Sequence, residues 1–282
     1  MSNVTSYLFE TKALKICPEN KPFWYTSGKI GPYFINTHFI YGSEEEANEL
    51  LKFIDAEKEN KQEIPKKVSG KTMKQYSQSV IYKTVIDEMV QAIRNNINTD
   101  EIDFISGGER RDWFFSYMIA KILNKPHITL FKDLTTVVTD ANGDAIEAEI
   151  SGKNVLHVAD LITEATSYIR SWIPAIKDLG ANIKWSMVVV DRMQGGKDKL
   201  DGVGIKSYEL IRVDNDLFEA ALKLGVINEE QLEMLKKFKA NPDETMREFL
   251  VNHPEFIENA LKADEKTAGR AKLCIDGNLY NL

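Results

Sequence analysis

Short apolar runs alternate with helical patterns between residues 102 and 211, and this alternation constrains the fold more than any other feature of the sequence. Runs of this kind are typical of buried strands. When helices connect successive strands, the strands form one parallel sheet with helices on both faces. We therefore expect an α/β fold with a mostly parallel sheet built from IDFIS (102–106), HITLF (127–131), NVLHV (154–158), IKWSMVVV (183–190) and IKSYELI (205–211).

A strong turn signal interrupts the alternation between the second and third runs. Asn142-Gly143 lies between two alternating segments in LTTVVTDANGDAIEAEIS (134–151). These two residues favour the tight turn that joins neighbouring antiparallel strands. We expect a two-stranded hairpin that projects from the sheet.

The whole chain divides into four segments by pattern. Residues 1–42 read as a short helix and an aromatic loop, which we expect to form an N-terminal hood. Residues 43–74 combine a helix, capped by Ser43, with a mobile lysine-rich surface insertion. Residues 75–213 begin with a long amphipathic helix and form the α/β core, and residues 214–282 carry only helical patterns. The sequence assigns no role to this C-terminal helical appendage.

Charge and hydropathy narrow the possible classes of function. The net charge is -7, with a pI near 5.3, whereas general nucleic-acid binders need a clustered positive surface. No apolar run approaches the roughly 18 residues that a membrane span requires. The N-terminus also lacks a basic segment followed by a long apolar stretch. We expect a soluble, cytoplasmic protein that binds neither nucleic acid nor membranes.

Cysteine and histidine spacing gives no sign of a protein-held metal. Cys17 and Cys274 lie far apart and form no paired ligand or redox spacing, so we expect reduced thiols. The histidines are also scattered, with no pair at helical spacing. We interpret them as surface or packing residues: His38, His127, His157 and His253.

The stretch HVADLITEAT (157–166) lies where an apolar run gives way to a helical pattern. At the carboxyl ends of parallel strands, loops enter helices and backbone N–H groups can bind anions. Asp160, Thr163 and Thr166 would stand at this edge, where they could hold a phosphorylated sugar. The alternative is that Asp160 or Thr163 only caps a helix.

This stretch resembles the motif V-D-D-x-x-T-x-G-T of the type I phosphoribosyltransferases, among which the orotate phosphoribosyltransferases are most similar. The segment Val158–Thr166 keeps one acid and both threonines but lacks the first acid and the glycine. The resemblance implies a Rossmann-like sheet with the family's fold. It also implies that Asp160 meets the ribose and that Thr166 holds the 5-phosphate of phosphoribosyl pyrophosphate.

A second similarity lies at residues 26–36, TSGKIGPYFIN, which resembles K-S-G-R-x-S-P-Y-F-x-N of the orotate enzymes. The resemblance implies that Phe34 is a platform for a flat pyrimidine base, with Tyr33 beside it, and that Lys29 is a candidate for binding pyrophosphate. The alternative is that both aromatic residues pack in the core of a short strand.

The third similarity is Asp191-Arg192, directly after the fourth apolar run. In the orotate enzymes an arginine here meets the substrate carboxylate together with a threonine, which implies that Arg192 and Thr163 bind the base. A planar guanidinium suits a carboxylate through paired hydrogen bonds. The alternative is a solvated or ion-paired arginine.

The fourth similarity is the loop SGGERRD (106–112), which approaches pyrophosphate in the family. Glycines permit close approach of the backbone, and Arg110 or Arg111 could neutralise charge on the leaving group. Lys132 matches the loop-entry lysine, so Lys132 and Asp160 are the candidate catalytic residues. The alternative is a tight turn in which the arginines pair with surface acids.

The resemblance implies transfer of ribose 5-phosphate from phosphoribosyl pyrophosphate to orotate or a similar base, with Mg²⁺, by a homodimer. Thr26, Ala159, Glu164 and an altered mobile loop depart from the pattern and favour an alternative, a regulatory binding protein without transfer. A transferase for another base is a third possibility. Glu164 would repel phosphate if it faced the site, but would be harmless if it faced outward.

Overall fold

The computed structural model describes residues 3–282, and contacts divide the chain into two compact units. The first unit contains the chain up to Ala13 and Thr37–Val213, and the second contains Leu14–Asn36 and Asp214–Leu282. Contacts therefore group most of the aromatic N-terminal loop with the C-terminal helices. The four functional segments expected from the sequence remain a prediction.

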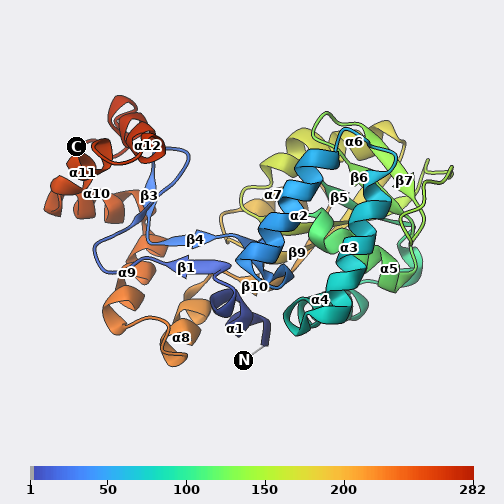
Figure 1. Cartoon of the computed structure of the whole chain (residues 1–282), viewed down its shortest axis with the longest axis horizontal. Helices are drawn as coiled ribbons and strands as arrows, with labels where there is room; N and C mark the ends of the chain where they lie inside the picture. Colours follow the sequence, from blue (N-terminus) through green and yellow to red (C-terminus); the bar gives the residue numbers. More distant parts are fainter. Residues whose placement is uncertain (1–2) are drawn as a thin grey trace. The chain divides into compact units, whose positions relative to one another are not determined.

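A six-stranded sheet forms the centre of the first unit, in the order β10-β9-β8-β5-β6-β7 (Figure 1). Every neighbouring pair is parallel except β6 and the edge strand β7, which are antiparallel. The expected mostly parallel α/β fold is confirmed. The strands are β5 (Phe104–Gly108), β6 (His127–Leu130), β7 (Thr136–Thr139), β8 (Asn154–Ile162), β9 (Asn182–Asp191) and β10 (Lys206–Arg212).

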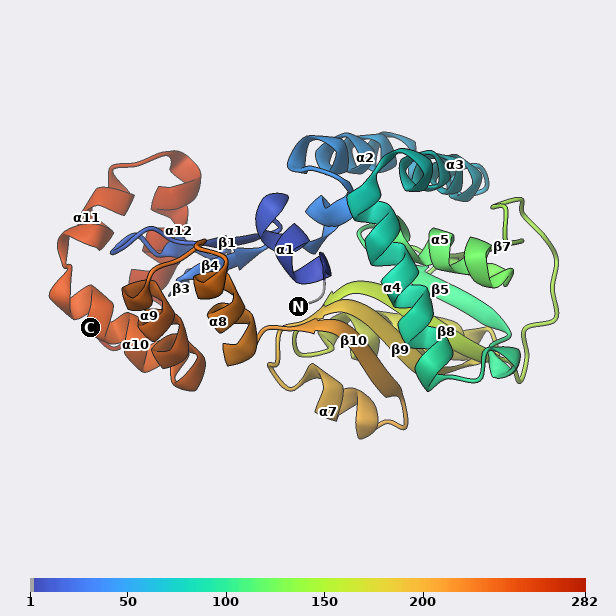
Figure 2. The same ribbon diagram turned by 90° about the horizontal axis from the view of Figure 1, so that it is seen from below.

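Helices α1, α4 and α5 lie over one face of the sheet, with α2 and α3 outside them (Figure 2). Apolar residues on the inner side of α4 and α5 pack against this face of the sheet, as the amphipathic pattern predicts. No helix within residues 3–282 has the length and apolar character needed to cross a membrane. The elements are α1 (Asn3–Glu10), η1 (Thr37–Tyr41), α2 (Glu44–Glu57), α3 (Ile64–Gln78), α4 (Val80–Asn96), η2 (Thr99–Glu101) and α5 (Trp113–Leu123).

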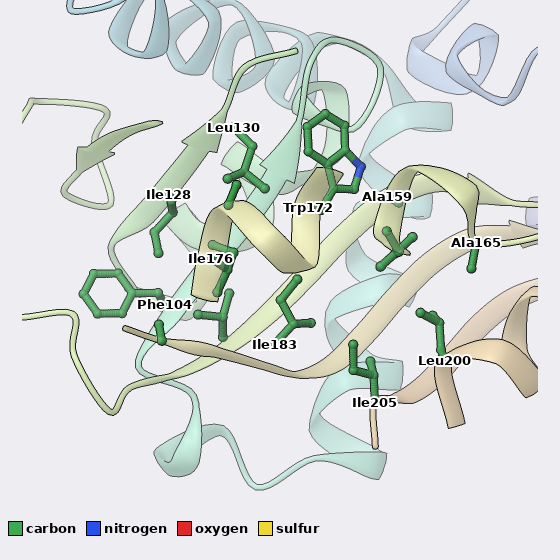
Figure 3. Packing of buried hydrophobic residues seen from close by; sticks show 14 of the residues in the cluster. Phe104, Ile128, Leu130, Ala159, Ala165, Trp172, Ile176, Ile183, Leu200 and Ile205 are labelled. Carbon is green, nitrogen blue, oxygen red and sulfur yellow. The ribbon is translucent and has the colours of Figure 1, made fainter. Parts of the chain in front are cut away.

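The opposite face is covered by the π-helical turn η3 (Tyr168–Trp172), α6 (Ile173–Asp178) and α7 (Gly196–Asp201). Side chains from these segments join the sheet in a buried apolar cluster that includes Trp172, Ile176 and Leu200 (Figure 3). Ala159 of β8 also belongs to this cluster and is 2% exposed. Position 159 therefore lies in the apolar cluster and also borders the cavity at the carboxyl edge of the sheet.

The Asn142-Gly143 turn forms, but the expected hairpin is mostly unpaired on its returning side. Gly143 adopts φ 89°, as a turn glycine does. The outgoing limb is β7, which joins the main sheet beside β6. Within residues 3–282 the returning limb makes only one bridge, between Thr139 and Ala145. The second limb carries several acids and alanines, which are poor strand formers.

The expectation of a mobile surface segment before residue 75 is wrong, because much of it forms helix α3. Ile64, Val68, Thr72 and Gln75 are buried and lie on one face at helical spacing. Pro65 stands in the first turn, where a proline costs no hydrogen bond. The lysines lie on the outer face of α3, and their number makes the segment polar in composition although it has a buried stripe. By contrast, Ser43 caps α2 as predicted.

The second unit combines two small antiparallel pairs with five helices among its described residues. Strand β1 (Leu14–Ile16) pairs with β4 (Tyr33–Ile35), and β2 (Phe23–Trp24) pairs with β3 (Ile30–Gly31). The rings of Phe218 and Phe238 each lie 5.8 Å from the ring of Tyr33. The helices are α8 (Asn215–Lys223), α9 (Glu229–Ala240), α10 (Pro242–Asn252), α11 (Glu255–Leu261) and α12 (Glu265–Asp276).

Candidate functional site

A cavity of about 560 Å³ opens at the carboxyl ends of the parallel strands of the first unit. Its wall combines the loop after β5, the start of the loop after β6 and the turn after β8. Six of the residues predicted from the sequence line this cavity: Arg110, Arg111, Lys132, Asp160, Thr163 and Thr166. The sequence predicted their convergence because parallel strands end at one edge of a sheet.

Asp160 is part of strand β8 and is 7% exposed. Its Oδ1 accepts a hydrogen bond from the Leu161 backbone N–H at 2.8 Å. The next helical turn begins at Tyr168, so neither Asp160 nor Thr163 caps it, and the capping alternative is wrong. Burial, and next the charge of Asp112, raise the pKa of Asp160 to about 7, while Arg111 lowers it.

Asp112 is the second buried carboxylate of the cavity, at 8% exposure. It immediately precedes α5, yet its side chain makes no capping hydrogen bond to that helix. Instead Oδ1 accepts from the Asp160 backbone N–H at 3.0 Å and Oδ2 accepts from the Gly108 N–H at 3.1 Å. Asp112 therefore ties the loop after β5 to the end of β8.

The turn after β8 keeps a left-handed residue where the family motif has glycine. Ala165 adopts φ 55° and is 4% exposed. A left-handed alanine costs roughly 1–2 kcal/mol, so the surrounding structure imposes this conformation. Glu164 faces outward, because its carboxylate accepts a hydrogen bond from Lys199 at 3.2 Å and its side chain is 61% exposed. The outward alternative for Glu164 is confirmed.

Replacing Ala165 with glycine should change the free energy of unfolding by less than about 0.5 kcal/mol, since relief of the left-handed backbone offsets the lost methyl burial and added chain entropy. Ala175→Gly is the matched control, because Ala175 is buried in the same cluster but lies in α6. It should lower the unfolding free energy by about 1–2 kcal/mol. Urea denaturation of both variants makes the comparison, and equal losses would contradict it.

The two arginines of the loop after β5 have different surroundings. The Arg110 guanidinium pairs with Asp55 of α2, and Lys58 lies 3.8 Å from the same carboxylate group. Arg111 lines the cavity and makes no ion pair among residues 3–282. Lys132 is exposed, and its backbone N–H donates to Glu109 Oε2 at 3.0 Å. Arg111 and Lys132 thus offer their charges to the cavity.

Arg192 follows β9 at the same sheet edge. The register pairs Ile162 with Asp191, and the Arg192 N–H donates to the Ile162 carbonyl at 3.0 Å. Thr163 and Arg192 are therefore the next residues on neighbouring strands. The guanidinium Nε of Arg192 is buried and has no hydrogen-bond partner among the described residues.

The remaining predicted residues, Lys29, Tyr33 and Phe34, belong to the second unit. Tyr33 is 5% exposed and packs in the aromatic core, whereas Phe34 is partly exposed beside the rings of Phe23 and Tyr25. Lys29 forms an ion pair with Asp243 at 2.7 Å. Their roles in base or pyrophosphate binding remain predictions.

Glu109 and Asp112 also line the cavity, although the sequence predicts no role in the site for either acid. The Glu109 carboxylate is 6% exposed and lies 3.7 Å from Lys58. One available signal was the acid placed four residues after Gly108, where glycine lets a side chain approach the backbone closely. The histidine prediction is confirmed for His38 and His127, which are buried packing residues whose pKa values burial lowers to about 3.

Comparison with known proteins identifies relatives. No family model matches the chain. It is 25% identical over 159 residues to the orotate phosphoribosyltransferase of Sulfolobus acidocaldarius, covering 56% of this chain and 76% of that relative. It is 44% identical over 80 residues to the orotate phosphoribosyltransferase of Pyrococcus abyssi, covering 28% of this chain but only 43% of that relative.

A solved orotate phosphoribosyltransferase from Francisella tularensis matches with a TM-score of 0.55 at 16% identity, covering 83% of this chain and 96% of that one. The sheet and the cavity at its carboxyl edge thus define a protein with the phosphoribosyltransferase fold. In sequence the chain is similar, as a divergent relative, to the orotate phosphoribosyltransferases of these organisms.

Proposed function

We propose that this protein transfers ribose 5-phosphate from phosphoribosyl pyrophosphate to orotate and releases pyrophosphate. The observation that carries the proposal is the convergence of Asp160, Thr163, Thr166 and Arg111 on one cavity at the carboxyl edge of the sheet. The cavity combines an acid for sugar hydroxyls, a turn for a phosphate and a free cation for a leaving group. A phosphoribosyl donor needs these three kinds of partner.

Each group has a distinct task in the proposed reaction. Thr166 and the backbone N–H groups of the turn bind the 5-phosphate, because such turns present donors to anions. Asp160 accepts hydrogen bonds from the ribose hydroxyls. Arg111 and Lys132 stabilise the negative charge that grows on pyrophosphate as its bond to the sugar carbon breaks. Arg110 has a smaller part, since Asp55 already pairs with its guanidinium.

The acceptor is orotate in this proposal, because its carboxylate suits Arg192. The roles of Phe34 and Tyr33 in base binding and of Lys29 in pyrophosphate binding remain proposals that rest on the resemblance alone. We treat magnesium as part of the donor substrate: the ion arrives on the pyrophosphate and neutralises part of its charge. We also propose a homodimer, which light scattering of the purified chain would test.

Turnover should be seen when the purified full chain is mixed with magnesium, phosphoribosyl pyrophosphate and orotate and the loss of orotate is followed. Arg192→Ala should lower kcat/KM for orotate by about 10- to 100-fold, since one charged hydrogen-bonding partner is lost. Lys206→Ala, which removes an exposed lysine outside the cavity wall, is the matched control for loss of a positive charge.

Other outcomes separate the alternatives. Orotate binding by calorimetry without turnover at high protein concentration would overturn transfer and support the regulatory binding protein. Turnover with another base but not with orotate would support a transferase of different specificity.

A further inference from the structure

One acid of the family's ribose motif is missing from this chain, where Ala159 takes its position. Ala159 is 2% exposed, belongs to the apolar cluster with Trp172 and also lines the cavity. Its methyl group offers no hydrogen-bond acceptor to a sugar hydroxyl. If two carboxylates serve the ribose, the second has to come from another element.

The loop after β5 supplies such a carboxylate. Asp112 Oδ1 accepts the Asp160 backbone N–H at 3.0 Å, and the charge of Asp112 raises the pKa of Asp160. Gly108 makes this approach possible, because a Cβ there would lie 2.9 Å from Asp112 Oδ2 and would overlap the Trp172 ring. Asp112 comes from the loop after β5 and Asp160 from strand β8, and both line the cavity.

We propose that Asp112 takes the place of the acid absent at Ala159 and that it positions Asp160 by sharing one proton with it. This inference rests on the proposed phosphoribosyl transfer. With both groups ionised, Asp160 Oδ2 is buried without a hydrogen-bond partner among residues 3–282. A shared proton supplies that partner and leaves the pair with one negative charge instead of two.

Three other groups face this pair of acids: Arg111, His157 and Tyr168. Arg111 is the cation that faces the pair and favours ionisation. His157 Nε2 lies 3.6 Å from Asp112 Oδ2, and the Nδ1 atom of the same ring contacts Ser106 Oγ at 2.9 Å. Tyr168 faces both acids, and its hydroxyl contacts Ser186 Oγ at 2.7 Å. Burial, the largest influence, and the charge of Asp112 raise the pKa of Asp160.

The shared proton matters for a substrate that carries several phosphate charges. Loss of the proton adds one negative charge close to the donor, which should weaken its binding by roughly tenfold between pH 6 and pH 8.5. Asp112→Asn removes that titration, because the amide stays neutral and donates a hydrogen bond to Asp160. In this variant the binding constant should change by about threefold or less over the same range.

The test uses the full chain in two measurements. The first follows the ¹³C carboxyl shift of Asp160, assigned with Asp160→Asn, during a pH titration without substrate. We expect a midpoint near 7 in the wild type, and in Asp112→Asn a midpoint lower by at least about one pH unit. The second measures binding of magnesium phosphoribosyl pyrophosphate by calorimetry at pH 6 and pH 8.5.

Control variants separate positioning from folding. Asp198→Asn removes an exposed acid outside the cavity wall and should match the wild type in both measurements. Equal Asp160 midpoints in the wild type and Asp112→Asn would overturn the shared proton and leave Asp112 as a backbone tie. No binding by the wild type at either pH would overturn the proposed function, which the substrate-free titration does not depend on.

Discussion

Arg111→Ala is expected to lower kcat/KM for the transfer reaction by about 100- to 1000-fold, the usual effect of removing a charge that stabilises a developing anion. Arg111 faces the cavity without an ion-pair partner among the described residues, so its charge is available to the leaving pyrophosphate. Arg111→Lys should recover part of the loss, because it keeps the charge but not the planar fork. Steady-state kinetics with the donor varied measures both effects.

Arg110→Ala is the matched control from the same loop. Its guanidinium pairs with Asp55, so we expect less than about a tenfold loss of kcat/KM, together with a small loss of stability typical of an exposed pair. Equal losses for the two variants would show that the loop acts through its total charge. A larger loss for Arg110→Ala would contradict our assignment of the pyrophosphate to Arg111.

Gly108→Ala is expected to lower the free energy of unfolding by about 2–3 kcal/mol, at the upper end of the usual cost of overpacking. The new methyl group would overlap the Trp172 ring and approach Asp112 Oδ2 to 2.9 Å, and neither neighbour is free to move. Trp172 belongs to the buried cluster, and Asp112 holds two backbone N–H groups. The variant should also bind the phosphoribosyl donor at least tenfold more weakly, because both displaced residues line the cavity.

Gly70→Ala is the control for a general effect of adding a methyl group. Nothing lies within 4 Å of a Cβ at Gly70, which is an interior residue of α3. The unfolding free energy should rise by about 0.5–1 kcal/mol, since alanine is the better helix former. Urea denaturation measures both variants, and an unchanged stability for Gly108→Ala would show that the loop after β5 yields more easily than its contacts imply.

The sequence predicts the sheet well because strand and helix patterns are local. Five apolar runs become β5, β6, β8, β9 and β10, and their parallel arrangement brings Asp160 and Arg111 to one edge. Helix α3 was not predicted, because its buried stripe includes the polar residues Thr72 and Gln75 and because lysines dominate its composition. Burial of polar side chains depends on tertiary neighbours, which local patterns do not contain.

The same limit explains what the sequence misses in the site. Asp112 stands before α5, where an acid normally caps the helix, so the residue type alone suggests a local role. Its side chain instead accepts N–H groups from Gly108 and from Asp160, which is 48 residues away in the chain. A contact between residues so far apart in the sequence produces no recognisable spacing of residue types. The left-handed backbone of Ala165 could not be predicted either, because an alanine side chain does not indicate this conformation.

The make-up of the second unit has a consequence for the order of events during synthesis. Tyr33 finds its aromatic partners in Phe218 and Phe238, and Trp24 stacks on Phe256 at 5.4 Å. A ribosome produces these partners only after the whole sheet of the first unit. Residues 14–36 therefore leave the ribosome early and have no core to pack against while the α/β unit folds. The second unit is completed last, when the C-terminal helices, to which the sequence alone assigned no role, have been synthesised.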